Sequence, residues 1–146
     1  MIALVEPPVQ IFGRARVAPP PGGFLQATKE GEAALLAGVR ETVAGAKKVA
    51  DLFAGSGTFT LPLAEAAEVH AVEGEAGMLG ALDQGWRRAQ GLKRVTTEVR
   101  DLFRRPLLPD ELKPFDAVVI DPPRAGAEAQ FAELADAQVS RIAAVS

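Results

Sequence analysis

From residue 29 onward, short apolar runs alternate with longer stretches in which apolar residues recur three and four positions apart. The short runs are rich in Val, Ala and Leu, which is typical of strands buried on both faces of a parallel sheet. The longer stretches have the period of amphipathic helices. We predict strands at 48–53, 69–73, 94–99, 115–120 and 141–145, and helices at about 29–44, 57–66, 75–90 and 126–136. The first helix has the clearest apolar stripe, formed by Leu35, Leu36, Val39 and Val43.

Alternation of strands and helices indicates right-handed βαβ units around a mainly parallel sheet, an α/β fold. Segment 101–114 is too short and too rich in proline for a full crossover helix. Residues 9–17 partly alternate and are a candidate strand, but the prolines and glycines at 19–23 interrupt regular structure. We predict that 1–23 is a remnant of a preceding domain and that 24–146 forms one domain.

The most informative motif follows the strand at 48–53, where Asp51 precedes the glycine pair Gly55 and Gly57. In open α/β sheets, ligands bind at the carboxyl ends of the strands, so this turn is the expected ligand site. A dinucleotide fingerprint has Gly or Ala where this chain has Thr60, and a phosphate loop needs a Lys that is absent here. Asp51 would repel a pyrophosphate but attract the sulfonium and ammonium groups of S-adenosylmethionine (SAM), which we therefore expect as the cofactor.

Further acids are predicted at the same edge of the sheet. Glu73 ends the second strand, 18 residues after Gly55, where an acid accepts both hydroxyls of a ribose. Asp101 follows the third strand and is a candidate acceptor for an adenine amino group. Asp121 and Pro122 follow the fourth strand, and the rigid Asp-Pro-Pro-Arg turn suits a planar base held by its polar edge. Its Arg124 stands where amino-group DNA methyltransferases have an aromatic residue.

Composition narrows the chemistry further. The net charge of −3 gives no general basic field for nucleic acid, and the arginine pairs are expected to be solvated surface. The chain contains no Cys, which excludes disulfides, thiolate metal sites and a Cys nucleophile within it. The single His70 lies in a predicted strand, and one His cannot supply a zinc site, so no metal is expected. The sequence has no signal segment and no long apolar run, from which we expect a cytoplasmic protein without membrane contact.

Several motifs, in order along the chain, resemble those of the bacterial SAM-dependent RNA 5-methyluridine (uracil-C5) methyltransferases. They are Gly23-Phe24-Leu25-Gln26-Ala27-Thr28, the segment from Asp51 to Thr60, Val72-Glu73, Asp101-Leu102-Phe103 and Asp121-Pro122-Pro123-Arg124-Ala125-Gly126. The resemblance implies a Rossmann-like methyltransferase fold with strand order 3-2-1-4-5, and RNA, either tRNA or rRNA, as the substrate.

The resemblance also implies roles for individual residues. SAM would be bound by Gln26, Asp51, Phe53, Gly55, Gly57, Thr58, Glu73, Asp101 and Asp121. The base would meet Asp121, Pro122 and Arg124. Thr58 and Thr28 stand where family members frequently have Asn. The family's nucleophilic cysteine follows the fifth strand, so it is expected just after Ser146.

We therefore predict that the chain is truncated after its fifth strand and does not methylate RNA by itself. An unpaired edge at that strand would favour self-association. Three other interpretations remain open. They are a complete small methyltransferase acting by direct transfer, for example on an amino group; a non-catalytic SAM- or nucleotide-binding module; and a structural α/β domain with a vestigial pocket.

Overall fold

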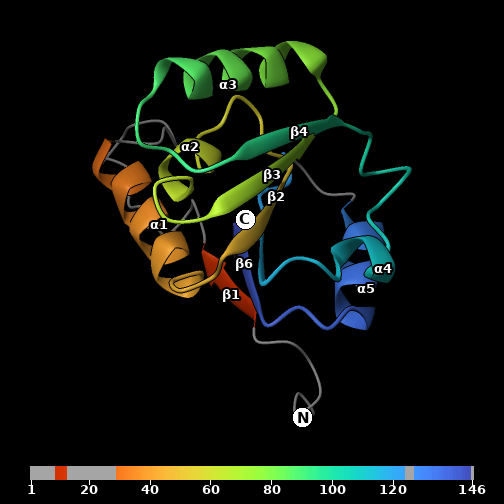
Figure 1. The fold of residues 1–146 in the computed structure, drawn as a ribbon. Helices are drawn as coiled ribbons and strands as arrows, with labels where there is room; N and C mark the ends of the chain where they lie inside the picture. Colours follow the sequence, from red (N-terminus) through yellow and green to blue (C-terminus); the bar gives the residue numbers. More distant parts are fainter. Residues whose placement is uncertain (1–8, 13–28, 124–126, 146) are drawn as a thin grey trace, which may run out of the picture.

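The computed structural model describes residues 9–12, 29–123 and 127–145, which form a six-stranded parallel sheet with helices on both faces (Figure 1). The strands are β1 (Val9–Phe12), β2 (Lys48–Leu52), β3 (Glu68–Glu73), β4 (Val95–Val99), β5 (Ala117–Ile120) and β6 (Arg141–Val145). The helices are α1 (Lys29–Thr42), α2 (Thr60–Leu63), α3 (Ala76–Arg88), α4 (Pro109–Leu112) and α5 (Glu128–Asp136). The predicted α/β class and the parallel sheet are confirmed.

The strand order is β1-β6-β5-β2-β3-β4. The five predicted strands are β2 to β6, and read from the β4 end they lie in the order β4-β3-β2-β5-β6. This is the predicted order 3-2-1-4-5. The candidate strand near the N-terminus is also present, and it pairs in parallel with β6, Val9 lying opposite Ile142. The fifth predicted strand therefore has neighbours on both sides, where we expected a free edge. Self-association stays a prediction, as does the boundary after residue 23, although four residues of that segment belong to the sheet.

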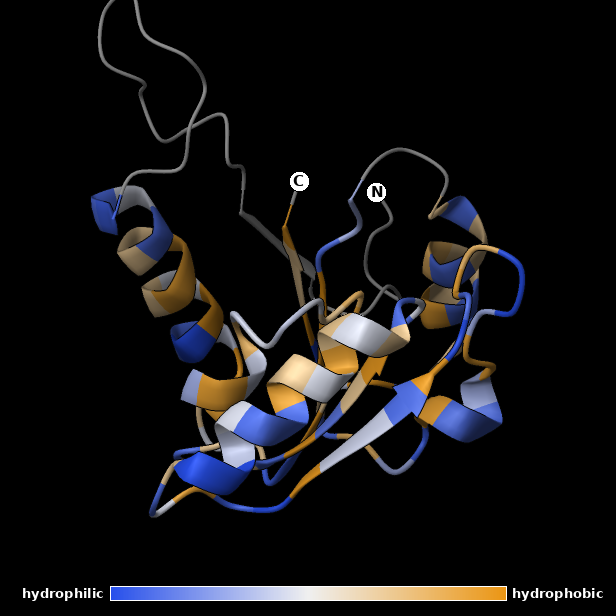
Figure 2. Ribbon diagram, turned by 90° about the horizontal axis from the view of Figure 1, so that it is seen from above, coloured by the Kyte–Doolittle hydropathy of each residue, from blue (hydrophilic) through white to orange (hydrophobic). Residues whose placement is uncertain are grey.

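Two apolar layers hold the helices against the sheet. On one face, α1, α2 and α3 pack on Val49, Val69 and Val119. On the other face, α4 and α5 pack on Leu52, Val72 and Ile120. Figure 2 shows that apolar and polar positions alternate along the helices. The buried helix residues, such as Leu35, Leu79 and Leu134, belong to these two layers. Since both faces are covered, every residue of β5 is buried, as the continuous apolar run predicts.

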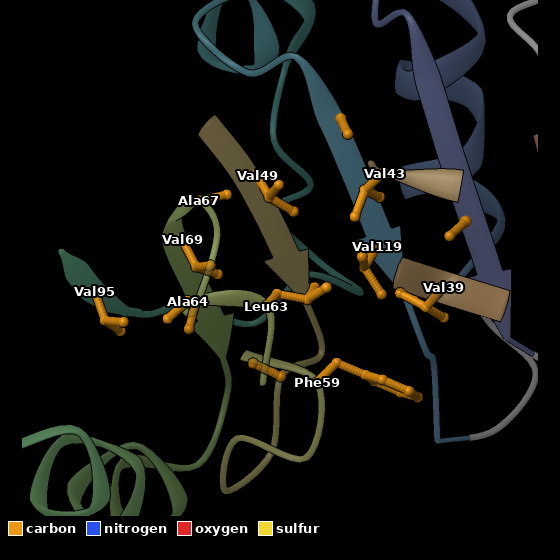
Figure 3. Close-up of a cluster of buried hydrophobic side chains, with 14 of the residues drawn as sticks. Val39, Val43, Val49, Phe59, Leu63, Ala64, Ala67, Val69, Val95 and Val119 are labelled. Carbon is orange, nitrogen blue, oxygen red and sulfur yellow. The ribbon is translucent and has the colours of Figure 1, made fainter. Parts of the chain in front are cut away.

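The predicted stripe of α1 is confirmed. Leu35, Val39 and Val43 are buried, and Leu36 packs against the same cluster. Figure 3 shows Val39 and Val43 close to Val119 of β5, with Phe59 and Leu63 completing this part of the core. The stripe fixes α1 against the face of the sheet that also carries the glycine turn.

Two helical segments are shorter than a full crossover helix. The expected helix at 57–66 is reduced to the single turn α2, because Gly57 has φ +103°, outside the helical region, and Pro62 lacks the N–H that a longer helix would need. In segment 101–114 the prediction of no full helix is confirmed, since only α4 forms there. None of the helices in the described ranges has the length and apolar character needed to cross a membrane.

Candidate functional site

The carboxyl ends of β2, β3, β4 and β5 meet at one edge of the sheet. The register pairs Leu52 with Val72 and with Ile120, and it pairs Glu73 with Val99. The backbone continues these contacts beyond the strands, because Asp121 N–H donates to the Leu52 carbonyl (3.3 Å) and Arg100 N–H donates to the Glu73 carbonyl (3.0 Å). The predicted acids Asp51, Glu73, Asp101 and Asp121 therefore all lie at this edge or within two residues beyond it.

The turn after β2 depends on backbone angles that favour glycine. Phe53, Gly55 and Gly57 have φ values of +61°, +60° and +103°. A Cβ on Gly57 would lie 3.0 Å from Leu82 Cγ of α3, whereas one on Gly55 would meet only Met78 Sδ at 3.9 Å. Gly57 thus allows the turn to approach α3 closely, and Gly55 supplies the left-handed conformation. Thr58, also predicted to contact the cofactor, is exposed at the end of this turn.

Glu73 connects β3 to the glycine turn. Its Oε1 accepts a hydrogen bond from Gly55 N–H (3.0 Å), and its Oε2 accepts one from Glu75 N–H (3.0 Å). A carboxylate offers about four acceptor positions, so these two bonds orient the group and leave positions for further donors. Hydroxyl groups of a bound sugar are donors of the required kind.

Asp51 is the most unusual group at this edge because its side chain has no exposed surface. Thr60 Oγ1 donates to its Oδ2 at 2.6 Å, while its Oδ1 is buried and has no hydrogen-bond partner within the described part of the chain. Burial raises the pKa of Asp51 to about 7; the Thr60 hydrogen bond opposes this rise, and the charges of Asp121 and Glu73 add to it. No cation among the described residues acts on this carboxyl group, so the site fits a ligand that carries positive charge.

Asp101 is positioned less tightly. Its Oδ1 accepts from Phe103 N–H (3.0 Å), which closes a short turn, and Arg104 Nε lies 3.8 Å from its Oδ2. Half of its side-chain surface is exposed, so the carboxylate can still accept from a ligand. Next to it, the rings of Phe53 and Phe103 pack with centroids 5.0 Å apart and planes tilted by 53°. This aromatic pair joins the glycine turn to the segment after β4.

The structure therefore brings together most of the predicted residues that it describes. Glu73 and Asp121 are close enough for their charges to act on Asp51, and Gly55 is hydrogen-bonded to Glu73. Pro122 is half-buried beside Asp121. Gln26 and Arg124 lie outside the described residues, so their predicted roles stay predictions.

Two residues of this edge, Thr60 and Phe103, are not among the predicted site residues. Thr60 enters the sequence prediction only through its size, although a hydroxyl nine residues after an acid near a strand end is a candidate donor to that acid. Phe103 was noted only as part of a motif, and its pairing with Phe53 could have been suspected from two aromatic residues at neighbouring strand ends.

The opposite edge of the sheet has a cavity of about 370 Å³. Its lining includes Lys48, His70, Arg94 and Phe115. The two ring nitrogens of His70 are hydrogen-bonded to Thr96 Oγ1 (2.7 Å) and Glu98 Oε1 (2.9 Å), so the ring is held as part of the sheet. In the described parts of the chain, no three His, Asp or Glu side chains are grouped as metal ligands would be. The carboxyl edge, with its unsatisfied buried oxygen, is the better candidate site.

Comparisons with known proteins give a consistent result. No protein-family model matches the chain. A Brucella suis protein named as an uncharacterized RNA methyltransferase is 55% identical over 145 residues, which are 98% of this chain and 35% of that protein. The 23S rRNA (uracil(1939)-C(5))-methyltransferase RlmD of Chromohalobacter salexigens is 40% identical over 86% of this chain and 26% of that enzyme. The chain thus spans about a third of the length of these relatives or less.

Among solved structures, the tRNA (uracil-54, C5)-methyltransferase of Pyrococcus abyssi, crystallised with S-adenosyl-L-homocysteine, superposes with a TM-score of 0.65. It is 25% identical, and the match covers 84% of this chain and 30% of that one.

Proposed function

We infer that this chain belongs to a family of RNA methyltransferases, and we propose from this premise that it binds SAM at the carboxyl edge of its sheet. The observation that carries the proposal is the buried Oδ1 of Asp51, which has no hydrogen-bond partner among the described residues. It lies next to the glycine turn, whose Gly55 N–H donates to Glu73. A cationic nucleoside supplies both the positive charge and the hydroxyl donors that these two groups lack. SAM has this combination, whereas the pyrophosphate of a dinucleotide would bring negative charge to the same place.

Each residue of the edge has a distinct task in this proposal. Glu73 accepts from the ribose hydroxyls, in an orientation held by Gly55 and Glu75. Asp51 and Asp121 provide negative charge for the methionine portion of the cofactor. Asp101 accepts from the adenine amino group, with Phe53 and Phe103 as an apolar wall beside it. The bound cofactor supplies the methyl group for transfer.

The substrate that we propose is RNA, and the reacting atom is C5 of a uracil. Support comes from the named activities of the relative from Chromohalobacter salexigens and of the Pyrococcus abyssi enzyme, and from the Asp-Pro-Pro-Arg turn at the same edge. Asp121, Pro122 and Arg124 would hold the base. Uracil-C5 chemistry needs a nucleophile, and a chain with no Cys does not contain the thiol that the family resemblance implies. We therefore propose that this chain binds SAM without methylating RNA by itself. We further propose that a longer protein of this kind, of which the chain would be about a third, acts on tRNA or rRNA in the cytoplasm.

Isothermal titration with SAM, S-adenosylhomocysteine and NAD tests the cofactor. We expect both adenosyl compounds to bind and NAD to fail. Glu73→Gln should weaken SAM binding more than tenfold, because a charge-assisted hydrogen bond is worth about 1.5–3 kcal/mol. The matched control is Glu75→Gln. Glu75 is an exposed acid of the same turn, and it bonds to Glu73 through its backbone N–H and not through its side chain. Tight NAD binding, or equal effects of the two substitutions, would overturn the proposal.

The predicted lack of activity has its own assay. Radiolabelled SAM and a uridine-containing RNA are incubated with the chain, and the RNA is analysed for 5-methyluridine. No product is expected, and steady turnover would show that the chain has a nucleophile-independent mechanism.

A further inference from the structure

We infer that Asp51 and Thr60 form a charge-sensing pair that distinguishes SAM from its demethylated product. The Asp51 carboxyl group, held by Thr60, gives up a proton when the cation binds. The inference rests on the proposed function, because it assumes that the cofactor occupies the carboxyl edge. It assigns Thr60 as a positioning residue and gives Asp51 a role in specificity.

The geometry of the pair is the first argument. Asp51 is completely buried, and Thr60 Oγ1, at 2.6 Å, is its one hydrogen-bond donor among the described residues. The bond fixes Oδ2, so Oδ1 is the oxygen left for a further proton or cation. Desolvation makes an ionised carboxylate costly there unless a positive charge approaches. A proton and a cationic ligand therefore compete for the same group.

The surrounding charges reinforce this competition. The charged groups that act on Asp51, within the part of the chain that the structure describes, are Glu73 at the end of β3 and Asp121 after β5. Both are acids on neighbouring strands, and both oppose ionisation of Asp51. Burial and these two acids raise its pKa to about 7, so the unliganded protein is a mixture of protonated and ionised forms at neutral pH.

The difference between the two ligands lies in charge. SAM has a sulfonium and an ammonium group, while S-adenosylhomocysteine has lost the sulfonium charge but keeps nearly the same shape. A more positive ligand stabilises ionised Asp51 more strongly and displaces its proton more completely. SAM affinity should therefore rise with pH more steeply than product affinity, which favours exchange of product for fresh cofactor.

The size of the effect follows from linkage. If SAM binds only the ionised form, its affinity should increase about eightfold between pH 6.0 and pH 7.5, with up to about 0.5 proton released per SAM at pH 7. S-adenosylhomocysteine should show a smaller increase and a smaller release. The protons are counted by titration calorimetry of the chain in two buffers that differ in ionisation enthalpy.

Two variants separate this role from a structural one. Asp51→Asn keeps an acceptor for Thr60 but cannot ionise, so SAM should bind more weakly, without proton release and without pH dependence. Thr60→Val removes the hydroxyl that favours the ionised form, so the pH dependence should move to higher pH. Thr97→Val, an exposed threonine of β4, is the control and should change nothing.

The outcomes distinguish the inference from the function beneath it. If neither SAM nor S-adenosylhomocysteine binds, the proposed function fails. If both bind with equal pH slopes and no proton release in the wild-type chain, the function stands and the charge-sensing role is wrong. That wild-type measurement decides the matter even where a variant fails to fold.

Discussion

Replacing Asp51 by Asn should change the pH dependence of stability in the absence of any ligand. The carboxyl group has an ordinary pKa of 3.8 when the chain is unfolded and a pKa of about 7 in the folded protein. The folded state therefore binds the proton more tightly, and the stability from this group is complete below pH 3.8 and is lost as the pH rises through 7. A neutral Asn has no such loss.

The magnitude can be worked out for an accessible pH range. Between pH 6 and pH 7 the unfolded carboxyl is ionised while the folded one is mostly protonated, so each pH unit costs the wild-type chain up to about 1.36 kcal/mol. Above pH 7 the cost levels off. From pH 6 to pH 8.5 the wild-type chain should lose about 1.4 kcal/mol of unfolding free energy through Asp51. The range stays above the isoelectric point of about 5.2, where solubility is lowest.

The assay is urea unfolding of the wild-type chain and of Asp51→Asn at both pH values. The difference between the two proteins should shift by about 1.4 kcal/mol in favour of the variant at pH 8.5. Any packing cost of the Asn side chain is present at both pH values and cancels. Asp116→Asn is the control: its pKa is lowered by the Lys47 and Lys48 N–H donors, so the group is ionised throughout and its effect should not vary. A difference for Asp51→Asn that is constant with pH would refute the buried, protonated state.

Two further predictions concern the structure around the site. Gly57→Ala should destabilise the chain by about 1–3 kcal/mol in urea unfolding, because the φ of +103° and the 3.0 Å approach to Leu82 both oppose a Cβ. The control is Gly80→Ala in α3, which has open space around it and should stabilise the chain by up to about 1 kcal/mol. Equal effects of the two substitutions would contradict the account. Arg100→Lys should cost about 2–3 kcal/mol, because the buried guanidinium donates to Glu98, to both oxygens of Glu111 and to the Arg105 and Pro106 carbonyls, which one ammonium cannot reproduce. The comparison is Arg104→Lys, because the Arg104 side chain is 88% exposed and its replacement should hardly change stability. A loss of stability as large as that of Arg100→Lys would refute the importance of the buried Arg100 guanidinium.

Much of the fold could be predicted because its signals are local. Leu35, Val39 and Val43 repeat with the helical period, and α1 buries them as predicted. The continuous apolar run at 117–120 predicts a strand covered on both faces, which β5 is. The parallel arrangement then follows from alternation, and it brings the strand-end acids to one edge.

The parts that could not be predicted depend on how distant segments meet. The helix expected at 57–66 is reduced to one turn because Gly57 has a φ of +103°, at a point where the turn comes close to Leu82, 25 residues further along the chain. The pairing of residues 9–12 with β6 joins segments more than 130 residues apart. The burial of Asp51, and its dependence on Thr60, follow from the path of the glycine turn in space. Sequence spacing identified the acid but gave no indication that its carboxyl group would be shielded from water.

The most direct test of the account is to locate the cofactor on the chain. Backbone amide NMR signals of isotopically labelled protein are followed during titration with S-adenosylhomocysteine, which is chemically stable. The account predicts that the largest changes occur at Gly55, Glu73, Asp101 and Asp121, where the carboxyl ends of the strands meet. Changes centred instead on Lys48, His70 and Phe115, at the cavity on the other edge, would contradict it.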